Sequence, residues 1–279
     1  MGVINITPDS FSDGGRFLDS ERAEREAAHQ LRSGADVLDL GAQSTRPGAS
    51  EVGAEEECHR LLQPLRAIRR QHPSALISVD TFHAAVAEAA LNAGADWIND
   101  VSGGERDPAM LPLMAEAGCP VVLMHNRGNS QTMDTLTDYD DVVLEVLQGL
   151  RRRSEVAIAA GVRSNQIIWD PGLGFAKTHE QNLEILQRLE CLTADGVPLL
   201  MGPSRKRFIG HVLNEPQPRA RIWGTAAVVC RCAHAGVAIV RIHDVKPMAQ
   251  TLKMAEQLWQ AESFRKNNKN PRPLTTPTV

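Results

Sequence analysis

The sequence predicts an α/β protein built as a single (β/α)8 TIM barrel with mobile βα loops at the C-terminal face, and three observations support this. Short apolar segments alternate with longer segments of helical spacing along nearly the whole chain. Such repeats require parallel strands with helices packed outside them. Eight repeats over about 250 residues match the size of a barrel. The competing architecture, an open doubly wound sheet, is disfavoured because no Gly-rich dinucleotide loop follows the first strand.

The predicted strands are short apolar runs, most of which have a polar residue, glycine or proline at or near the carboxyl end. In chain order they cover residues 3–6, 36–41, 76–80, 97–101, 121–125, 167–171, 198–202 and 238–244. The segments with helical spacing are 20–34, 55–71, 82–94, 107–118, 140–161, 179–192 and 221–236. Glycine, the usual helix stop, closes several of them, namely at Gly34, Gly94, Gly118, Gly161 and Gly236.

Composition and charge restrict the class of protein. With 42% hydrophobic and 23% charged residues the chain has the composition of a globular protein with one large or two small domains. Because no domain linker is visible, we expect one domain over residues 1–262. Residues 263–279 are polar and Pro-rich, which predicts a disordered tail. A formal net charge of -4 argues against nucleic acid as a partner.

The sequence also indicates how the chain relates to membranes and where in the cell it is expected. No apolar run approaches the ~20 residues that span a bilayer, and no secretory signal is visible. The five scattered cysteines do not form a disulfide framework, which predicts reduced thiols and a cytoplasmic protein.

Polar side chains stand in or at the ends of the predicted strands, although a parallel core strand is normally an unbroken apolar run. They are Asn5, Asp80, Asn99, Asp100, His125, Asp170, Arg241 and His243. Any one of them alone is readily explained as a helix cap or a structural hydrogen bond. Because strand ends converge on one face of a barrel, where barrel enzymes build their sites, the whole set predicts an active site.

These residues fall into two chemical groups. Asp80, Asn99 and Asp170 suit a flat heterocycle edge with N–H donors in a row, since charge-assisted hydrogen bonds to such an edge are strong. The second group is cationic and predicts an anion, most economically phosphate; it comprises Arg46, Lys206, Arg241 and His243. The cations around Lys206 in "SRKR" are expected to need an anionic partner, because they oppose a helix dipole. A substrate with both a ring and a phosphate is therefore expected.

Eight segments in order resemble the dihydropteroate synthase family of pterin-binding enzymes, over Gly2 to about Trp259. They are "GVINITPDSFSDGG", "STRPGA", "ISVDTF", "INDVSGG", "LMHNRG", "DPGLGFAKT", "GPSRKRFIG" and "RIHDV". The resemblance implies condensation of 6-hydroxymethyl-7,8-dihydropterin diphosphate with p-aminobenzoate to give 7,8-dihydropteroate and diphosphate. It also implies a need for Mg²⁺, inhibition by sulfonamides and a homodimer. The charge and the lack of a long apolar run separately predict no nucleic acid and no membrane partner.

The resemblance further implies roles for individual residues. The pterin would contact Asp80, Asn99, Asp170 and Lys206. The diphosphate would contact Asn5, Arg241 and His243, with Asn5 also reaching Mg²⁺. The p-aminobenzoate pocket would be formed by Phe11, Thr45, Arg46, Pro47, Phe175 and Lys206. The catalytic set would be Asp9, Asp13, Arg46, Lys206, Arg241 and His243, with Asp9 and Asp13 on a loop that closes over the site.

Two other functions remain open at this point. A methyltetrahydrofolate-dependent corrinoid methyltransferase would share the Asp/Asn group but would not need the cationic group. A catalytically silent paralogue would bind a partner instead. The role of His125 is also open between a hydrogen bond near the pterin and a place in the core.

Overall fold

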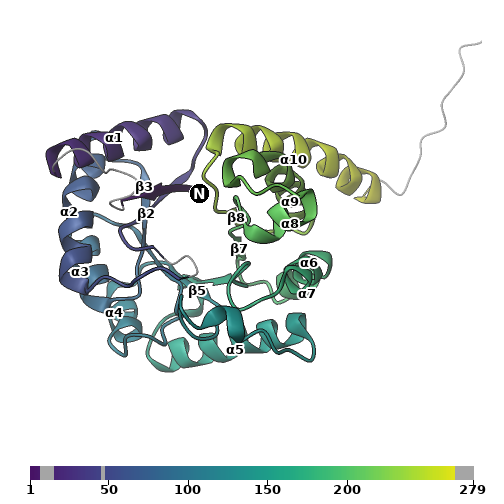
Figure 1. Ribbon diagram of the computed structural model, residues 1–279, viewed down its shortest axis with the longest axis horizontal. Helices are drawn as coiled ribbons and strands as arrows, with labels where there is room; N and C mark the ends of the chain where they lie inside the picture. Colours follow the sequence, from purple (N-terminus) through teal and green to yellow (C-terminus); the bar gives the residue numbers. More distant parts are fainter. Residues whose placement is uncertain (7–15, 45–47, 268–279) are drawn as a thin grey trace, which may run out of the picture.

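The structure is a computed structural model that describes residues 1–6, 16–44 and 48–267. Eight parallel strands form its centre and helices surround them (Figure 1). The strands are β1 (Gly2–Asn5), β2 (Val37–Gly41), β3 (Leu76–Asp80), β4 (Trp97–Asp100), β5 (Val121–Met124), β6 (Ile167–Asp170), β7 (Leu200–Met201) and β8 (Ile239–Val240). Each overlaps its predicted segment.

The strands close into a ring, which confirms the predicted barrel. Strands β1 to β6 pair in chain order, and β7 pairs with β8. Parallel bridges between Trp169 and Leu199 and between Gly2 and Ile242 join the two sheets on both sides. At the second junction Val3 N donates to Ile242 O at 3.0 Å, and Ile242 N donates to Met1 O at 3.0 Å. The carboxyl ends of all eight strands therefore face one end of the barrel.

The α-helices lie outside the strands, as the alternating pattern predicts (Figure 1). They are α1 (Arg16–Arg32), α2 (Ala54–Gln71), α3 (Ala84–Asn92), α4 (Met110–Ala117), α5 (Val142–Ala159), α6 (His179–Gln187), α7 (Glu190–Thr193), α8 (Arg207–Leu213), α9 (Ile222–His234) and α10 (Val245–Asn267). Short 3₁₀ helices cover η2 (Met133–Thr135), η3 (Ser164–Gln166) and η4 (Pro218–Arg221). In the described part of the chain, no helix is long and apolar enough to cross a membrane.

Two helices are absent from the prediction, and each absence has a physical cause. The seven residues of α8 are too few to display a helical period. Pro247 reads as a helix breaker in the sequence, but it lies in the first turn of α10, where its missing N–H costs nothing. This helix runs to Asn267, beyond the predicted domain end at 262, and residues 268–279 lie outside the described part.

A small apolar layer fills the barrel beneath the strand ends. It consists of Met1, Val37, Val122, Ile168 and Leu200, with Trp97 and Ile239 packed against it. The larger core lies between strands and helices and includes Leu38, Leu40, Ile77 and Trp169. The inner apolar layer fills the amino-terminal part of the barrel, and the polar side chains of the strands lie beyond it toward the carboxyl end.

Candidate active site

A largely buried ion-pair network connects residues of β2, β3 and β4 with the residue after β8, toward the carboxyl end of the barrel. Arg241, directly after β8, donates through Nε to Asp39 Oδ2 at 2.6 Å. Its Nη2 donates to Asp80 Oδ2 at 2.7 Å. Asn99 stands beside Asp80 in the strand register, and its Nδ2 donates to Asp39 Oδ2 at 3.3 Å. Three of the predicted site residues therefore share one network, which we call the polar floor.

Asp39 belongs to this floor but was missed from the sequence. It lies inside β2, is 0% exposed, and accepts a hydrogen bond from Ser78 Oγ at 2.6 Å. The prediction considered mainly the polar residues that end strands. An aspartate in the middle of the apolar segment "DVLDLG" was a usable signal, because an unpaired carboxylate there would be costly.

One guanidinium lies between two carboxylates in the floor, and this affects the pKa of Asp80 and of Arg241 itself. Burial raises the pKa of Asp80, and Arg241 only partly opposes the rise because Asp39 shares its charge. Burial alone would lower the pKa of Arg241, but Asp39 and Asp80 outweigh it and raise that pKa. The guanidinium is thus firmly charged.

Asp170 and Lys206 complete the floor on its other side. Asp170 ends β6, is 8% exposed, and accepts a hydrogen bond from Gly172 N at 2.7 Å through Oδ1. Burial raises the pKa of Asp170, whereas Gly172 N–H and the charges of Lys206 and Arg241 lower it. Burial lowers the pKa of Lys206 to about 8, while Asp170 and Asp80 oppose that shift. Asp170 and Asp80 therefore act on the same ammonium group.

His243 and Asn5 lie near the rim of this end. Ser204 Oγ accepts from His243 N at 3.0 Å and lies 2.9 Å from its Nδ1, which orients the imidazole. Asn5 ends β1 and is half-buried. Among the described residues its carboxamide has no hydrogen-bond partner, so it is available to a ligand.

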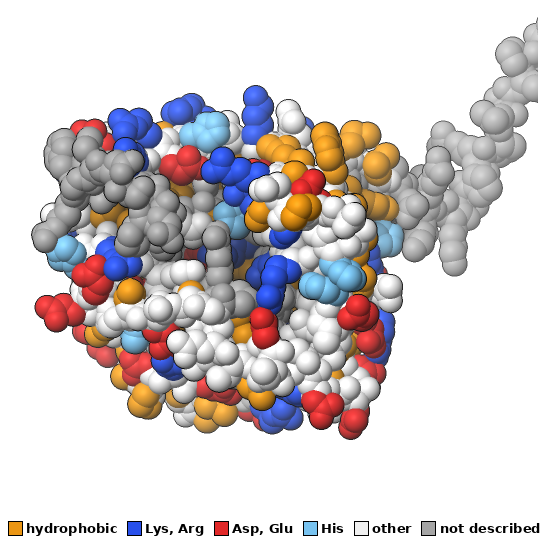
Figure 2. Space-filling model, in the orientation of Figure 1, with side chains coloured by type: hydrophobic (Ala, Val, Ile, Leu, Met, Phe, Trp, Pro, Cys, Tyr) orange, Lys and Arg blue, Asp and Glu red, His pale blue; other side chains and the backbone are white. Residues whose placement is uncertain are grey.

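The sequence predicts that the cations of "SRKR" bind an anionic ligand, but two of them pair with carboxylates of the protein. The prediction is wrong for those two residues. Arg205 pairs with Asp244 at 2.6 Å, and Arg207 pairs with Asp134 at 2.7 Å. Lys206 alone faces the floor carboxylates and the Phe175 ring, whose centroid lies 4.4 Å from Nζ. Figure 2 shows several Lys and Arg side chains around the middle of this face.

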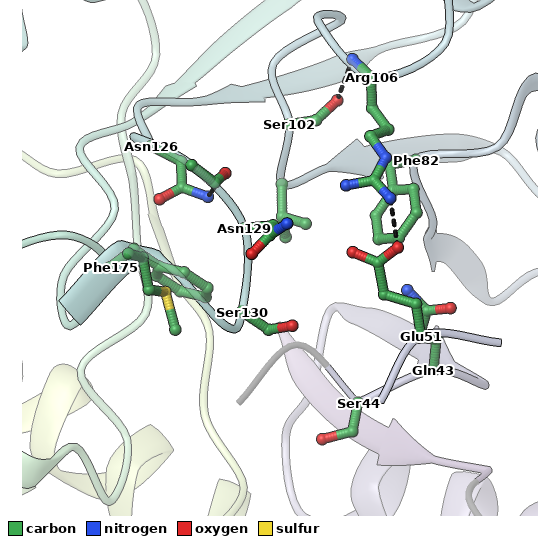
Figure 3. Close-up of a pocket in the computed structure, with 13 residues that line it drawn as sticks. Gln43, Ser44, Glu51, Phe82, Ser102, Arg106, Asn126, Asn129, Ser130 and Phe175 are labelled. Carbon is green, nitrogen blue, oxygen red and sulfur yellow. Dashed lines mark hydrogen bonds and ion pairs between the residues drawn. The ribbon is translucent and has the colours of Figure 1, made fainter. Parts of the chain in front are cut away.

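A pocket opens beside the polar floor, between the loops that follow β2 to β6 (Figure 3). The space between its lining atoms amounts to about 460 Å³, and this figure includes space that is open to solvent. Phe175, Asn126 and Asn129 line one side, and Phe82, Arg106 and Glu51 line the other (Figure 3). Phe175 is a predicted site residue that lines this pocket. Ser44, which precedes the predicted site residue Thr45, lies at the edge of the pocket.

Six predicted site residues lie outside the described part of the chain: Asp9, Phe11, Asp13, Thr45, Arg46 and Pro47. The stem that follows the last three is described. Gly48 N donates to Ser130 O at 2.8 Å, and Ser130 Oγ donates to Ala49 O at 2.9 Å. The loop after β2 is therefore fastened to the loop after β5.

His125, whose role was open, has core surroundings. It is 5% exposed, and its Nδ1 lies 3.3 Å from Nζ of Lys177, a buried residue that the sequence argument overlooked. Lys177 stands between the loop after β6 and the cap of α6, a position at which a buried lysine is rare.

Comparisons with known proteins agree with this geometry. Residues 1–243 match the family model described as pterin binding enzyme. The dihydropteroate synthase of Synechocystis sp. is 48% identical over 260 residues, which cover 93% of this chain and 90% of that protein. The Xanthomonas albilineans dihydropteroate synthase with 4-aminobenzoic acid has 40% identity and a TM-score of 0.86, covering 94% and 92% of the two chains. The Yersinia pestis enzyme in a sulfonamide drug complex has 37% identity and a TM-score of 0.87, covering 93% and 94%.

Proposed function

Because this chain belongs to the pterin-binding enzymes, and among them to the dihydropteroate synthases, we propose roles for the residues of its polar floor and rim. As a transferase of this family it joins a dihydropterin diphosphate to p-aminobenzoate, giving dihydropteroate and diphosphate. The observation that carries the proposal is the convergence of Asp80, Asn99 and Arg241 from three strands onto one buried network.

The pterin ring binds to Asp80, Asn99 and Asp170. A pterin edge presents adjacent N–H donors, which suit carboxylate and carboxamide oxygens. Asp170 uses Oδ1 for Gly172 N, which leaves Oδ2 for the ring. Lys206 supplies a donor to the opposite edge, and its nearness to Asp170 keeps it oriented.

The diphosphate binds at Asn5, Arg241 and His243. Arg241 donates two of its five N–H groups to Asp39 and Asp80, and the other three can donate to phosphate oxygens. In this proposal Ser204 Oγ, which accepts from His243 N, also donates its hydroxyl proton to Nδ1, 2.9 Å away. The imidazole proton then sits on Nε2, where it donates to the anion.

The residues present fit a Mg²⁺ ion that is shared with the substrate. The described residues contain no group of three or more His, Cys, Asp or Glu side chains that could hold a metal. Mg²⁺ commonly takes few protein ligands together with substrate phosphates, and the unpartnered carboxamide of Asn5 offers one oxygen. When bound, the ion neutralises negative charge that develops on the leaving diphosphate.

The p-aminobenzoate ring lies against Phe175 and Lys206, at the edge of the pocket in Figure 3. The lining of this pocket supports that placement, because it includes both Phe175 and Ser44, the residue before Thr45. Thr45, Arg46, Pro47 and Phe11 complete the slot in this proposal. Sulfonamide inhibition stays a prediction that rests on the same slot.

The charges of the site suggest the course of the reaction. The bond between the pterin methylene carbon and the diphosphate oxygen breaks, and Arg241 and His243 stabilise the negative charge that collects on the diphosphate. Asp80 and Asp170 stabilise the electron-poor pterin left behind. The neutral arylamine attacks this carbon and then loses a proton, so no strong general base is needed. Water competes for the same carbon, so its exclusion from the site favours transfer to the arylamine. Asp9 and Asp13 belong to the catalytic set in this proposal and lie outside the described residues.

The first prediction concerns the dependence of diphosphate release on both additives. With dihydropterin diphosphate and Mg²⁺, the purified chain is expected to release diphosphate at least tenfold faster when p-aminobenzoate is added. A chelator is expected to suppress that release, and excess Mg²⁺ to restore it. Release that is equally fast without the arylamine would contradict the proposed coupling, and release unaffected by chelation would contradict the role of Asn5 and the metal.

The chain forms a homodimer through an apolar face of α8, α9 and α10. Five large hydrophobic side chains there are exposed: Val212 (57%), Leu213 (47%), Trp223 (79%), Met254 (58%) and Leu258 (56%). Hydrophobic side chains gather on this side in Figure 2, where Figure 1 places α9 and α10. Apolar patches of this kind mark interfaces more often than free surface.

The five free cysteines support a reducing, cytoplasmic location.

The second prediction tests this face. Sedimentation velocity of the wild type is expected to give the mass of two chains, and Trp223→Ser with Met254→Ser is expected to shift it toward one chain. Val156→Ser on α5, which is 59% exposed, is the control and is expected to leave the dimer intact. A monomeric wild type would refute the proposed homodimer.

A further inference from the structure

The loop between β6 and α6 has a backbone that few sequences tolerate. Three of its residues adopt positive φ angles: Gly172 (70°), Gly174 (76°) and Ala176 (47°). Alanine is unfavourable in this left-handed region, so surrounding contacts must maintain the conformation. The loop also carries Phe175, which separates two of these residues.

Lys177 provides such contacts from inside the loop. It is 8% exposed, and its Nζ donates to Gly172 O at 3.1 Å and to Phe175 O at 3.0 Å. The same nitrogen lies 3.3 Å from His125 Nδ1. One ammonium group therefore joins both ends of the turn around Phe175 and ties them to the residue that follows β5.

The anchor of this contact is itself rigid. His125 N donates to Asp170 O at 2.8 Å, and Gly149 of α5 leaves room for the imidazole, since a Cβ there would lie 2.6 Å from its Cδ2. Burial, and then the positive charge of Lys177, lower the pKa of His125 to about 2, so the ring is neutral and can accept at Nδ1. Burial also lowers the pKa of Lys177 to about 7, because a buried site disfavours the charged ammonium form.

Lys177 reaches Asp170 only indirectly, through Gly172 and through its charge, whereas it bonds directly to Phe175 O. The two substrate subsites therefore differ in how directly they depend on Lys177. Asp170 is paired with Met124 in the strand register, and its side chain is fixed by Gly172 N. Phe175 lies five residues further on, outside the strands. Apart from Lys177, a further hydrogen bond that holds its neighbourhood runs from Gly174 N to Asn182 Oδ1 at 2.6 Å.

We propose that Lys177 is a positioning residue that fixes Phe175 and so sets the affinity for the arylamine substrate, while the pterin subsite depends on it little. This inference rests on the proposed function in one respect, that Phe175 contacts p-aminobenzoate. Two of the three polar contacts of Lys177 Nζ are to carbonyl groups of one turn, the third ties that turn to His125, and the turn presents Phe175 to the pocket (Figure 3).

Steady-state kinetics of Lys177→Met test the proposal. The KM for p-aminobenzoate is expected to rise roughly tenfold, as for the loss of one or two hydrogen bonds, while the affinity for the pterin changes less than twofold. Lys177→Gln, whose amide keeps N–H donors, is expected to recover part of the loss. Lys253→Met, an exposed lysine on α10, is the control.

The outcomes separate this inference from the proposed function. If Phe175→Ala raises the KM for p-aminobenzoate and the Lys177 variants do not, the positioning role is overturned and the site stands. If Phe175→Ala has no effect either, the assignment of Phe175 itself fails. Equal losses for both substrates in the Lys177 variants would reduce the residue to a general structural role. Should Lys177→Met fail to fold, Lys177→Gln alone decides by the same comparison.

Discussion

Replacing Arg241 by alanine is expected to lower the free energy of unfolding by about 3–5 kcal/mol and to remove most of the activity. The loss of stability follows because Asp39 and Asp80 are 0% and 8% exposed and share this guanidinium. Without it, two carboxylates remain buried next to each other with no cation between them. The loss of activity follows because the donors proposed for diphosphate disappear as well.

Two measurements separate the ion-pair network from a general packing defect. In Arg241→Ala the pKa of Asp80 rises further in the folded state, and an acid with a raised folded pKa destabilises a protein increasingly as pH rises. The penalty is therefore expected to shrink when chemical denaturation is repeated near pH 5 instead of pH 8. Asp39→Asn added to Arg241→Ala is expected to recover part of the lost stability. A penalty that is independent of pH, with strictly additive single and double variants, would count against the network.

Replacing Asp170 by asparagine is expected to weaken pterin binding by roughly 10- to 150-fold, since a charge-assisted hydrogen bond contributes about 1.5–3 kcal/mol. Gly172 N donates to one side-chain oxygen of this residue, so the amide oxygen of asparagine will take that position. Its NH2 group is then turned toward the ring, and a donor meets a donor. The fold is retained because the hydrogen bond to the loop is kept.

Titration calorimetry with a pterin ligand measures this change directly. Asp96→Asn is the matched control, because Asp96 also accepts a backbone N–H, from Ile77, but precedes a strand at the opposite end of the barrel. It is expected to leave pterin affinity within twofold of the wild type. Wild-type affinity in the Asp170 variant would remove this residue from the pterin site.

The barrel could be predicted because its pattern is local. Each strand is a run of adjacent apolar residues, and polar residues at strand ends such as Asp80 and Asp170 stand out beside them. Asp39 escaped because in a strand buried on both faces the sequence does not reveal which side chains point inward. The network around it joins residues up to 202 positions apart, which no local pattern can indicate.

The pairing of charges was also beyond a local reading. The sequence predicts an anion site for all the cations near Lys206, whereas Arg205 and Arg207 pair with carboxylates 39 and 73 positions away. Lys177 was overlooked for a related reason. Its burial follows from the packing of the loop after β6 against His125, which brings together residues 52 positions apart.

A crystal structure of this chain with its dihydropterin diphosphate substrate would test the account most directly. It is expected to place the fused ring within hydrogen-bond distance of Asp80, Asn99 and Asp170, with both phosphate groups turned toward Asn5, Arg241 and His243. A ring lodged instead among Phe82, Arg106 and Met133, remote from those three acceptors, would contradict it.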